Sequence, residues 1–283
     1  MFMNILPLEK KIQVLSALVE GNSVRATGRM TGVAKGTINR FLARVGKACM
    51  EYQDTMLRDL TCTNIQCDEI WSFCYAKEKN VPEVHKGEFG YGDIWTWVAI
   101  DADTKLVPSW SVGLRDIACA KKFMLDLKNR LTNRVQLTTD GYGAYLAAVE
   151  NAFGSEIDYS MLIKIYGQQP DGEKRYSPAD CIATDKRIMQ GDPDVKKIST
   201  SFIERQNLTM RMNMRRFTRL TNAFSKKIEN LEYAVALHFM YYNFCRPHKT
   251  LNPKAIGITP AMAAGVSDNR WTLEDIIYLA GSN

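Results

Sequence analysis

Three acidic residues lie where an unpaired carboxylate would be costly. Asp68 interrupts the apolar run NIQCDEIWSFCYA, Asp140 closes the segment VQLTT just before the turn GYG, and Glu204 stands at the head of a basic stretch. Carboxylates on two strands and an adjacent helix can converge on Mg²⁺ or Mn²⁺, which prefer oxygen ligands. Two such ions, about 3.5–4 Å apart, clamp the attacking and leaving oxygens of a phosphodiester. The pattern therefore predicts a two-ion site, with Asp68 bridging the ions, Asp140 on one and Glu204 on the other.

Each acid also has an ordinary interpretation, and on its own that interpretation is no weaker. Asp140 could be a turn residue before glycine. Glu204 could favour the positive end of its helix, and Asp68 could pair with a lysine. The joint occurrence of all three favours the metal site.

Other acids compete for the same task. Glu69 follows Asp68 directly, so in a regular strand its side chain points to the opposite face. Asp101 and Asp103 fall in a segment typical of a hairpin turn. We therefore expect these three residues to lie outside the metal site.

The basic residues around the third acid suggest a path for a polyanion. Arg211 follows Glu204 by seven residues, nearly two helical turns, so both side chains share a face. Asn207, one turn from Glu204, is expected to orient it. The remaining basic residues of this stretch are expected to contact DNA phosphates, which gives affinity without sequence choice; they are Arg205, Arg215 and Arg216. A solvated basic face is the alternative.

The charge of the chain is unevenly distributed. The formal net charge is +6, but residues 1–60 and 201–254 are both basic, whereas the rest of the chain is acidic overall. Such an arrangement favours a polyanionic partner held at two regions. Arg246 and His248, which follow an apolar helical segment, are further candidates for DNA contact.

Composition excludes other classes of protein. The seven cysteines form no close CxxC pair and the three histidines are scattered, so no zinc motif is present. The longest apolar stretch is too short to cross a bilayer, and the opening residues lack the layout of a signal peptide. We therefore expect a cytoplasmic protein without membrane contact, associated with the bacterial nucleoid.

Residues 1–60 are expected to form a small all-α, helix-turn-helix DNA-binding domain. The apolar period of LPLEKKIQVLSALVEG stops at Gly21, a short helix follows an N-cap at Asn22 or Ser23, and a third helix begins after the turn at Gly32. The third helix would present its polar residues to DNA; they are Lys35, Thr37, Asn39, Arg40 and Arg44. A plain three-helix cap is the alternative.

Residues 61–250 are expected to form the catalytic domain. Three runs rich in aromatic and branched residues predict antiparallel strands, and helical and strand patterns then alternate. This order predicts an α/β fold with a mixed sheet flanked by helices. Residues 167–200 are polar and aperiodic and are expected to be a loop insertion, 201 to about 220 a basic helix, and 251–283 a C-terminal helical tail.

Four motifs in this order, CDEIWSF, TTDGYGAY, ERQNLTMR and YYNFCRPHKTL, resemble those of a DDE transposase of the insertion-sequence-one type. The resemblance covers about residues 61–265 and assigns the DDE triad to Asp68, Asp140 and Glu204. It implies a ribonuclease-H-like catalytic fold and a requirement for divalent metal. It also implies double-stranded DNA as the partner, as element terminal repeats and as target, with cutting and joining at the element ends.

The resemblance has two departures and leaves two alternatives. The cysteines of an N-terminal zinc finger, found in some members, are lacking, and the 64-residue gap from Asp140 to Glu204 is longer than in compact members. Because two ends are joined in one event, a homodimer or higher oligomer is expected. The alternatives are a ribonuclease-H-like nuclease without strand transfer, and an inactive or domesticated helix-turn-helix regulator.

Overall fold

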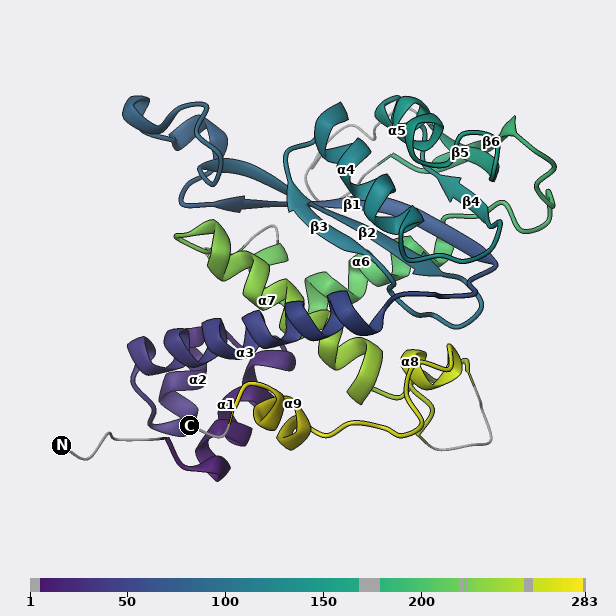
Figure 1. Ribbon diagram of the computed structural model, residues 1–283. Coiled ribbons are helices and arrows are strands. Elements are labelled where there is room, and N and C mark those ends of the chain that lie inside the picture. The colour runs from purple at the N-terminus through teal and green to yellow at the C-terminus, as the bar shows by residue number, and fades with distance from the viewer. Residues whose placement is uncertain (1–5, 168–178, 219–220, 222, 252–256, 282–283) are drawn as a thin grey trace.

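A six-stranded mixed sheet forms the centre of the computed structural model, which describes residues 6–167, 179–218, 221, 223–251 and 257–281 (Figure 1). The strands are β1 (Asn64–Cys74), β2 (Gly92–Asp101), β3 (Trp110–Gly113), β4 (Gln136–Thr139), β5 (Asp158–Tyr166) and β6 (Cys181–Gln190). Their order is β3-β2-β1-β4-β5-β6. The pairs β1–β4 and β4–β5 are parallel, whereas β1–β2, β2–β3 and β5–β6 are antiparallel. The predicted mixed sheet is confirmed, and it is consistent with a ribonuclease-H-like fold.

Helices cover both faces of this sheet (Figure 1). The α-helices of the described part are α1 (Leu8–Val19), α2 (Val24–Thr31), α3 (Lys35–Met56), α4 (Ile117–Lys128), α5 (Ala144–Phe153), α6 (Ser201–Asn213), α7 (Ile228–Met240), α8 (Pro260–Ala263) and α9 (Leu273–Leu279). Short 3₁₀ turns lie at η1 (Glu78–Asn80), η2 (Glu83–His85) and η3 (Arg215–Phe217), and the π-turn η4 (Tyr241–Cys245) continues α7. The pair α4 and α5 covers one face and α6 with α7 the other. Within the described ranges, no helix combines the length and apolar character that crossing a membrane requires.

The first two N-terminal helices begin and end close to where the sequence predicts, and the third begins there. Ser23 caps α2 by accepting a hydrogen bond from the amide of Ala26 at 3.1 Å, and Gly32 ends that helix at φ 72°. The third helix, α3, continues to Met56 and packs along α7. At their crossing, a Cβ added to Gly46 would lie 2.4 Å from the Cβ of Tyr233, so only glycine permits this approach.

Two segments differ from the sequence-based expectation. The predicted basic helix over 201 to about 220 ends at Asn213, because burial of Phe217 draws the following residues into the turn η3. Part of the predicted loop at 167–200 forms β6, which pairs with β5 along the edge of the sheet. Its side chains are almost all exposed, so no alternation of apolar and polar residues marks it in the sequence. Residues 168–178 of the predicted loop lie outside the described part.

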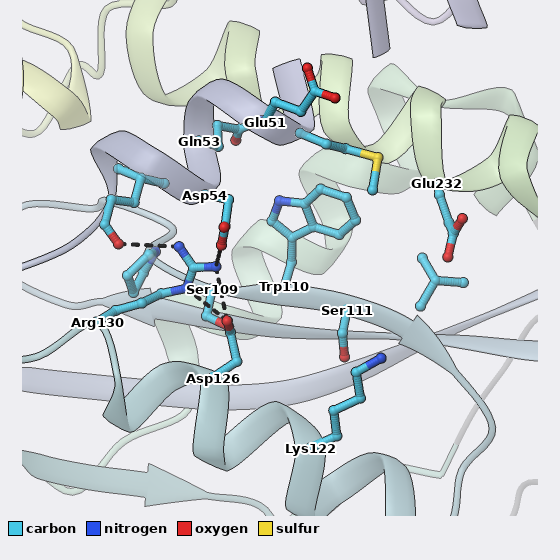
Figure 2. Close-up of a pocket in the computed structure, with 14 residues that line it drawn as sticks. Glu51, Gln53, Asp54, Ser109, Trp110, Ser111, Lys122, Asp126, Arg130 and Glu232 are labelled. Carbon is cyan, nitrogen blue, oxygen red and sulfur yellow. Dashed lines mark hydrogen bonds and ion pairs between the residues drawn. The ribbon is translucent and has the colours of Figure 1, made fainter. Parts of the chain in front are cut away.

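The long helix α3 is tied to the sheet layer through Arg130, which follows α4. Its guanidinium donates to Asp126 Oδ2 at 2.7 Å, Asp54 Oδ1 at 2.8 Å and the carbonyl of Leu57 at 3.1 Å (Figure 2). The network borders a cavity of about 390 Å³ that Trp110 also lines. Arg130 thus links the predicted DNA-binding helices to the predicted catalytic domain.

We expect Arg130→Ala to lower the free energy of unfolding by about 2 kcal/mol, since removal leaves the buried carbonyl of Leu57 without its donor and Asp126 with Ser109 as its remaining donor. Urea unfolding measures this loss. The control is Lys47→Ala, which breaks the exposed 3.8 Å pair with Glu51 and should change stability by less than about 0.5 kcal/mol. Equal effects in the two variants would contradict a structural role for the network.

Candidate active site

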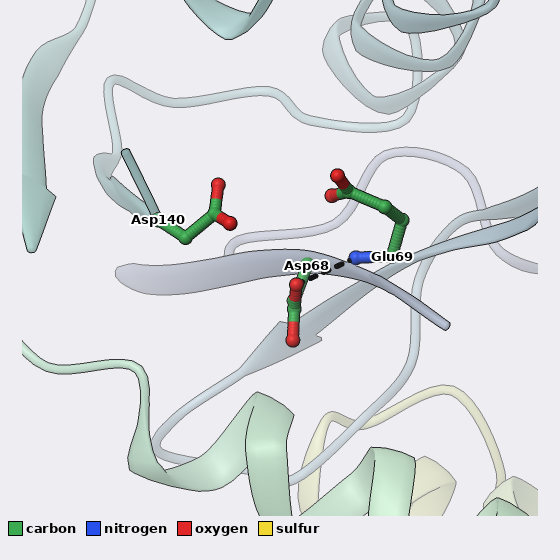
Figure 3. A group of neighbouring side chains, drawn as sticks. All are labelled: Asp68, Glu69 and Asp140. Carbon is green, nitrogen blue, oxygen red and sulfur yellow. Dashed lines mark hydrogen bonds between the residues drawn. The ribbon is translucent and has the colours of Figure 1, made fainter. Parts of the chain in front are cut away.

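Two of the predicted acids meet where β1 and β4 separate. Cys67 of β1 pairs in parallel with Thr139, the last residue of β4, so Asp68 and Asp140 are the next residues on each chain. Each of Asp68, Glu69 and Asp140 offers a carboxylate oxygen within 4.8 Å of those of the other two (Figure 3). The register of the sheet therefore creates an acidic cluster at the carboxyl end of a parallel strand pair.

The third acid comes from α6, whose first turn is attached to β1. Gln66 Oε1 accepts hydrogen bonds from the amides of Phe202 at 2.9 Å and Ile203 at 3.2 Å, which takes the place of an N-cap side chain. Gln66 and Asp68 are two residues apart and so face the same helix. This attachment directs Glu204 of α6 toward the acidic cluster.

Asn207 forms the second link between α6 and β1. Its side-chain amide donates to Asp68 Oδ2 at 2.8 Å, and the amide of Glu69 donates to Asp68 Oδ1 at 2.8 Å. The sequence predicts that Asn207 orients Glu204, but its hydrogen bond goes to Asp68. Asn207 therefore holds the carboxylate of the first acid in place.

One cleft of about 760 Å³ brings the predicted residues together. It is lined by the three predicted acids, by the predicted orienting residue, by one predicted DNA-binding residue and by several residues that were not predicted. These are Asp68, Asp140, Glu204, Asn207 and Arg211, with Glu69, Arg115, Tyr142, Lys164 and Thr200 among the others. Asp101 and Asp103 lie at the turn after β2, as expected, where Asp101 Oδ2 accepts from the amide of Thr104 at 2.9 Å.

Glu69 lies in the cleft, contrary to the prediction from the sequence. Its side chain does point toward α5, where Tyr145 Oη donates to it at 3.0 Å, yet its carboxylate belongs to the acidic cluster. Because β4 ends at Thr139, no β4 residue pairs with β1 beyond Cys67, and side chains from both faces of β1 reach the same cleft. Arg115 Nε also donates to Glu69 at 2.6 Å, so this carboxylate already has a cationic partner.

The cluster places like charges close together. Burial, and then the neighbouring carboxylates of Glu69 and Asp140, raise the pKa of Asp68 to about 7, although the amide hydrogen bond from Glu69 acts against the rise. A hard divalent cation would relieve this repulsion, and an all-oxygen donor set suits Mg²⁺ or Mn²⁺. The residues present thus fit such an ion, with Asp68 and Asp140 as its candidate ligands.

Glu204 is held differently from the other two acids. Its Oε2 accepts from Lys164 Nζ of β5 at 2.5 Å, and its Oε1 accepts from Thr200 Oγ1 at 2.5 Å. Burial lowers the pKa of Lys164, but the ion pair with Glu204 outweighs it, so the net pKa lies above its ordinary value. Sequence reasoning missed Arg115 and Lys164, because neither lies in a distinctive motif.

The predicted DNA-contacting residues of α3 lie on its first three turns. Lys35, Arg40 and Arg44 are exposed, whereas Thr37 and Asn39 are half-buried. Arg40 donates to Thr37 Oγ1 at 3.4 Å. This end of the helix therefore carries accessible positive charge.

The basic residues near α6 divide into two groups. Arg205, Arg215 and Arg246 are exposed. Arg216 is half-buried, its Nε donates to Ser225 Oγ at 2.8 Å, and burial lowers its pKa to about 10. Arg216 thus contacts the protein interior, unlike its neighbour Arg215.

His248 belongs to a basic cluster on the side of α6 that carries Arg205. Burial, and then the positive charges of Lys105, Arg246 and Arg205, lower the pKa of His248, so these four groups act on one another. Lys105, which was not predicted, lies over the ring of Phe202 at 3.8 Å. The cluster gathers positive charge from three separate segments of the chain.

The chain is similar to solved structures. No protein-family model matches the chain, and no curated protein matches it. A crystal structure of the Mos1 mariner paired end complex with Mn is 12% identical, and the alignment covers 56% of this chain and 60% of that chain with a TM-score of 0.23. The aligned part is less than two thirds of either chain, so the assignment of a function depends on the residues of the cleft.

Proposed function

We propose that this protein is a metal-dependent DDE transposase, a polynucleotidyl transferase that cuts DNA at the ends of a mobile element and joins them to target DNA. The single observation that supports this most is the convergence of Asp68, Asp140 and Glu204 on one cleft, from two adjacent strands and a helix. The residues of the triad come from distant parts of the chain. An all-oxygen set in a cleft is suited to phosphoryl transfer assisted by hard cations.

Bound divalent cations, two in our proposal, would activate the attacking oxygen and stabilise the leaving oxygen. Asp68 and Asp140 would hold them, with Glu204 completing the set. Asn207 fixes the Asp68 carboxylate through its 2.8 Å hydrogen bond. Arg211, which lines the same cleft, would bind the phosphate that reacts.

The reaction has two phosphoryl transfers. In the first, water adds to phosphorus at the element end, and the 3′ oxygen leaves and takes up a proton. In the second, that 3′ hydroxyl attacks a phosphorus of the target strand and displaces the target 3′ oxygen. Both steps need the same alignment of attacking and leaving oxygens, and no covalent bond to the protein forms.

DNA would follow the exposed basic residues. Phosphate contacts would come from Arg205, Arg215, Arg246 and His248, and the first turns of α3 would bind the terminal repeats. Joining two ends in one event favours a homodimer or higher oligomer on the DNA. We also propose that the protein is a transposase of the insertion-sequence-one type and that residues 1–60 form a separate helix-turn-helix domain.

A strand-transfer assay tests the function. The assay combines purified protein, Mg²⁺ and a supercoiled plasmid with a labelled DNA duplex. The duplex is made from the DNA flanking the coding region, and its 3′ end is already exposed. We expect the label to become joined to the plasmid. Nicked plasmid without joined label would instead identify a nuclease, and bound but unreacted DNA would identify a regulator.

A further inference from the structure

Lys164 is a cation that faces the third acid inside the cleft. It comes from β5, two strands away from Asp68, and its ammonium lies 2.5 Å from Glu204 Oε2. Thr200 occupies the other oxygen of the same carboxylate. Both oxygens of Glu204 therefore have partners within the protein.

This arrangement separates Glu204 from the other acids. Within the described residues, the group of carboxylates whose oxygens lie within 4.8 Å of one another contains Asp68, Glu69 and Asp140, but not Glu204. Glu69 has Arg115 as its partner, so Asp68 and Asp140 are the acids whose repulsion a cation would relieve. A first cation is therefore attracted to Asp68 and Asp140, whereas a second one using Glu204 must compete with Lys164.

The Lys164–Glu204 pair is suited to exchange. Both side chains are half-exposed, at 30% and 40%, and an ion pair of this kind contributes little to folding. The pair of Arg115 with Glu69 differs, because the Glu69 side chain is only 1% exposed. The ammonium of lysine is also a compact charge that binds phosphate without a fixed geometry.

We infer that Lys164 is a latch on Glu204, which keeps the second cation weakly bound until a DNA phosphate enters the cleft and takes over the ammonium. The inference rests on the proposed function and adds a regulation of the same site. Lys164 is a positioning residue, because it acts on cation binding through Glu204. Because coupling between ligands is reciprocal, the second cation must also raise DNA affinity by the same factor.

The test measures Mn²⁺ binding by electron paramagnetic resonance of the free ion, so it does not depend on catalysis. In the absence of DNA, wild type is expected to bind one ion tightly and a second weakly. Lys164→Gln should tighten the second ion by about tenfold or more, since a positive charge next to its ligand is lost. Lys164→Arg keeps the charge and should retain the wild-type pattern.

Lys128→Gln is the matched control. Lys128 pairs with Glu156 at 3.0 Å outside the cleft, so its removal also breaks a lysine–glutamate pair but should leave both affinities unchanged. A second measurement uses wild type alone. Adding a short DNA duplex should tighten the second ion, after subtraction of the ions that the duplex itself binds.

The outcomes separate the latch from the proposed function. An unchanged second-ion affinity in Lys164→Gln, or no effect of the duplex on wild type, overturns the latch. If wild type binds no Mn²⁺, or Asp68→Asn binds it as wild type does, the metal site and the proposed function both fail. If one ion binds tightly and the affinity for the second ion does not change when Lys164 is replaced, the latch is wrong but the proposed function is not affected.

Discussion

Asp68→Asn is expected to reduce metal-dependent cleavage and joining by at least about a thousandfold, because the amide has lost the charge that holds a cation. The amide keeps the shape of the carboxylate and can still accept the hydrogen bond from Asn207. DNA binding should therefore persist. Gel assays of cleavage and joining, with a binding titration at the same salt, measure the two effects separately.

The same substitution should stabilise the protein when metal is removed. The pKa of Asp68 rises from its ordinary value of 3.8 to about 7 in the folded protein. A carboxyl group whose pKa is higher in the folded than in the unfolded protein stabilises the fold when the pH is below its unfolded pKa. This stabilisation is lost as the pH increases from about 4 to 7. The substituted amide has no such titration, so at pH 8 the variant should be more stable by on the order of 2 kcal/mol, allowing for solvent near a half-buried group.

Urea unfolding with a chelator at pH 4 and pH 8 measures this gain. The difference between wild type and variant should be small at pH 4 and large at pH 8. Asp268→Asn, at an exposed position outside the cleft, controls for loss of a carboxylate and should show no such trend. A variant less stable than wild type at pH 8 would mean that Asp68 forms a favourable ion pair, as the ordinary interpretation of its sequence position has it.

Glu204→Gln should also lower cleavage about a thousandfold, but through the second cation. Glutamine can still accept from Thr200, so α6 should keep its position. We expect one tightly bound Mn²⁺ and little binding of a second, while DNA binding is retained because phosphate contacts come from the basic residues.

The control is Glu156→Gln, which removes an exposed carboxylate that also pairs with a lysine. It should retain both cleavage and ion binding. Normal cleavage by Glu204→Gln would remove this residue from the triad, whereas loss of DNA binding would show that it supports the fold of α6. Comparison of Glu204→Gln with Glu156→Gln shows whether Glu204 is a metal ligand or only a structural residue.

The sequence predicts the structure correctly where that structure depends on residues close together in the chain. Ser23 caps α2, as the sequence predicts, and caps of the same local kind form at Thr259 of α8 and at Thr272 with Asp275 of α9. Each of these depends on residues three positions apart. The strands around Asp68 and Asp140 were also predicted, because β1 and β4 are buried and rich in apolar and branched residues.

The predictions from the sequence are wrong where contacts between distant segments decide the structure. The strand β6 exists because its backbone pairs with β5, and its exposed side chains leave no pattern. The end of α6 depends on burial of Phe217. Glu69 reaches the cleft because β4 is short, a fact about its neighbour rather than about its own strand.

The sequence by itself determined most of the helices and strands, the excess of basic residues and the positions of the three candidate acids, because propensity, capping and the cost of an isolated charge act over a few residues. Only the tertiary structure decided how these acids differ. Parallel pairing of β1 with β4 joins Asp68 to Asp140, while β5 brings Lys164 to Glu204 from 40 residues away in the chain. Such partners are selected by packing and by the need to balance buried charge, which no local pattern records.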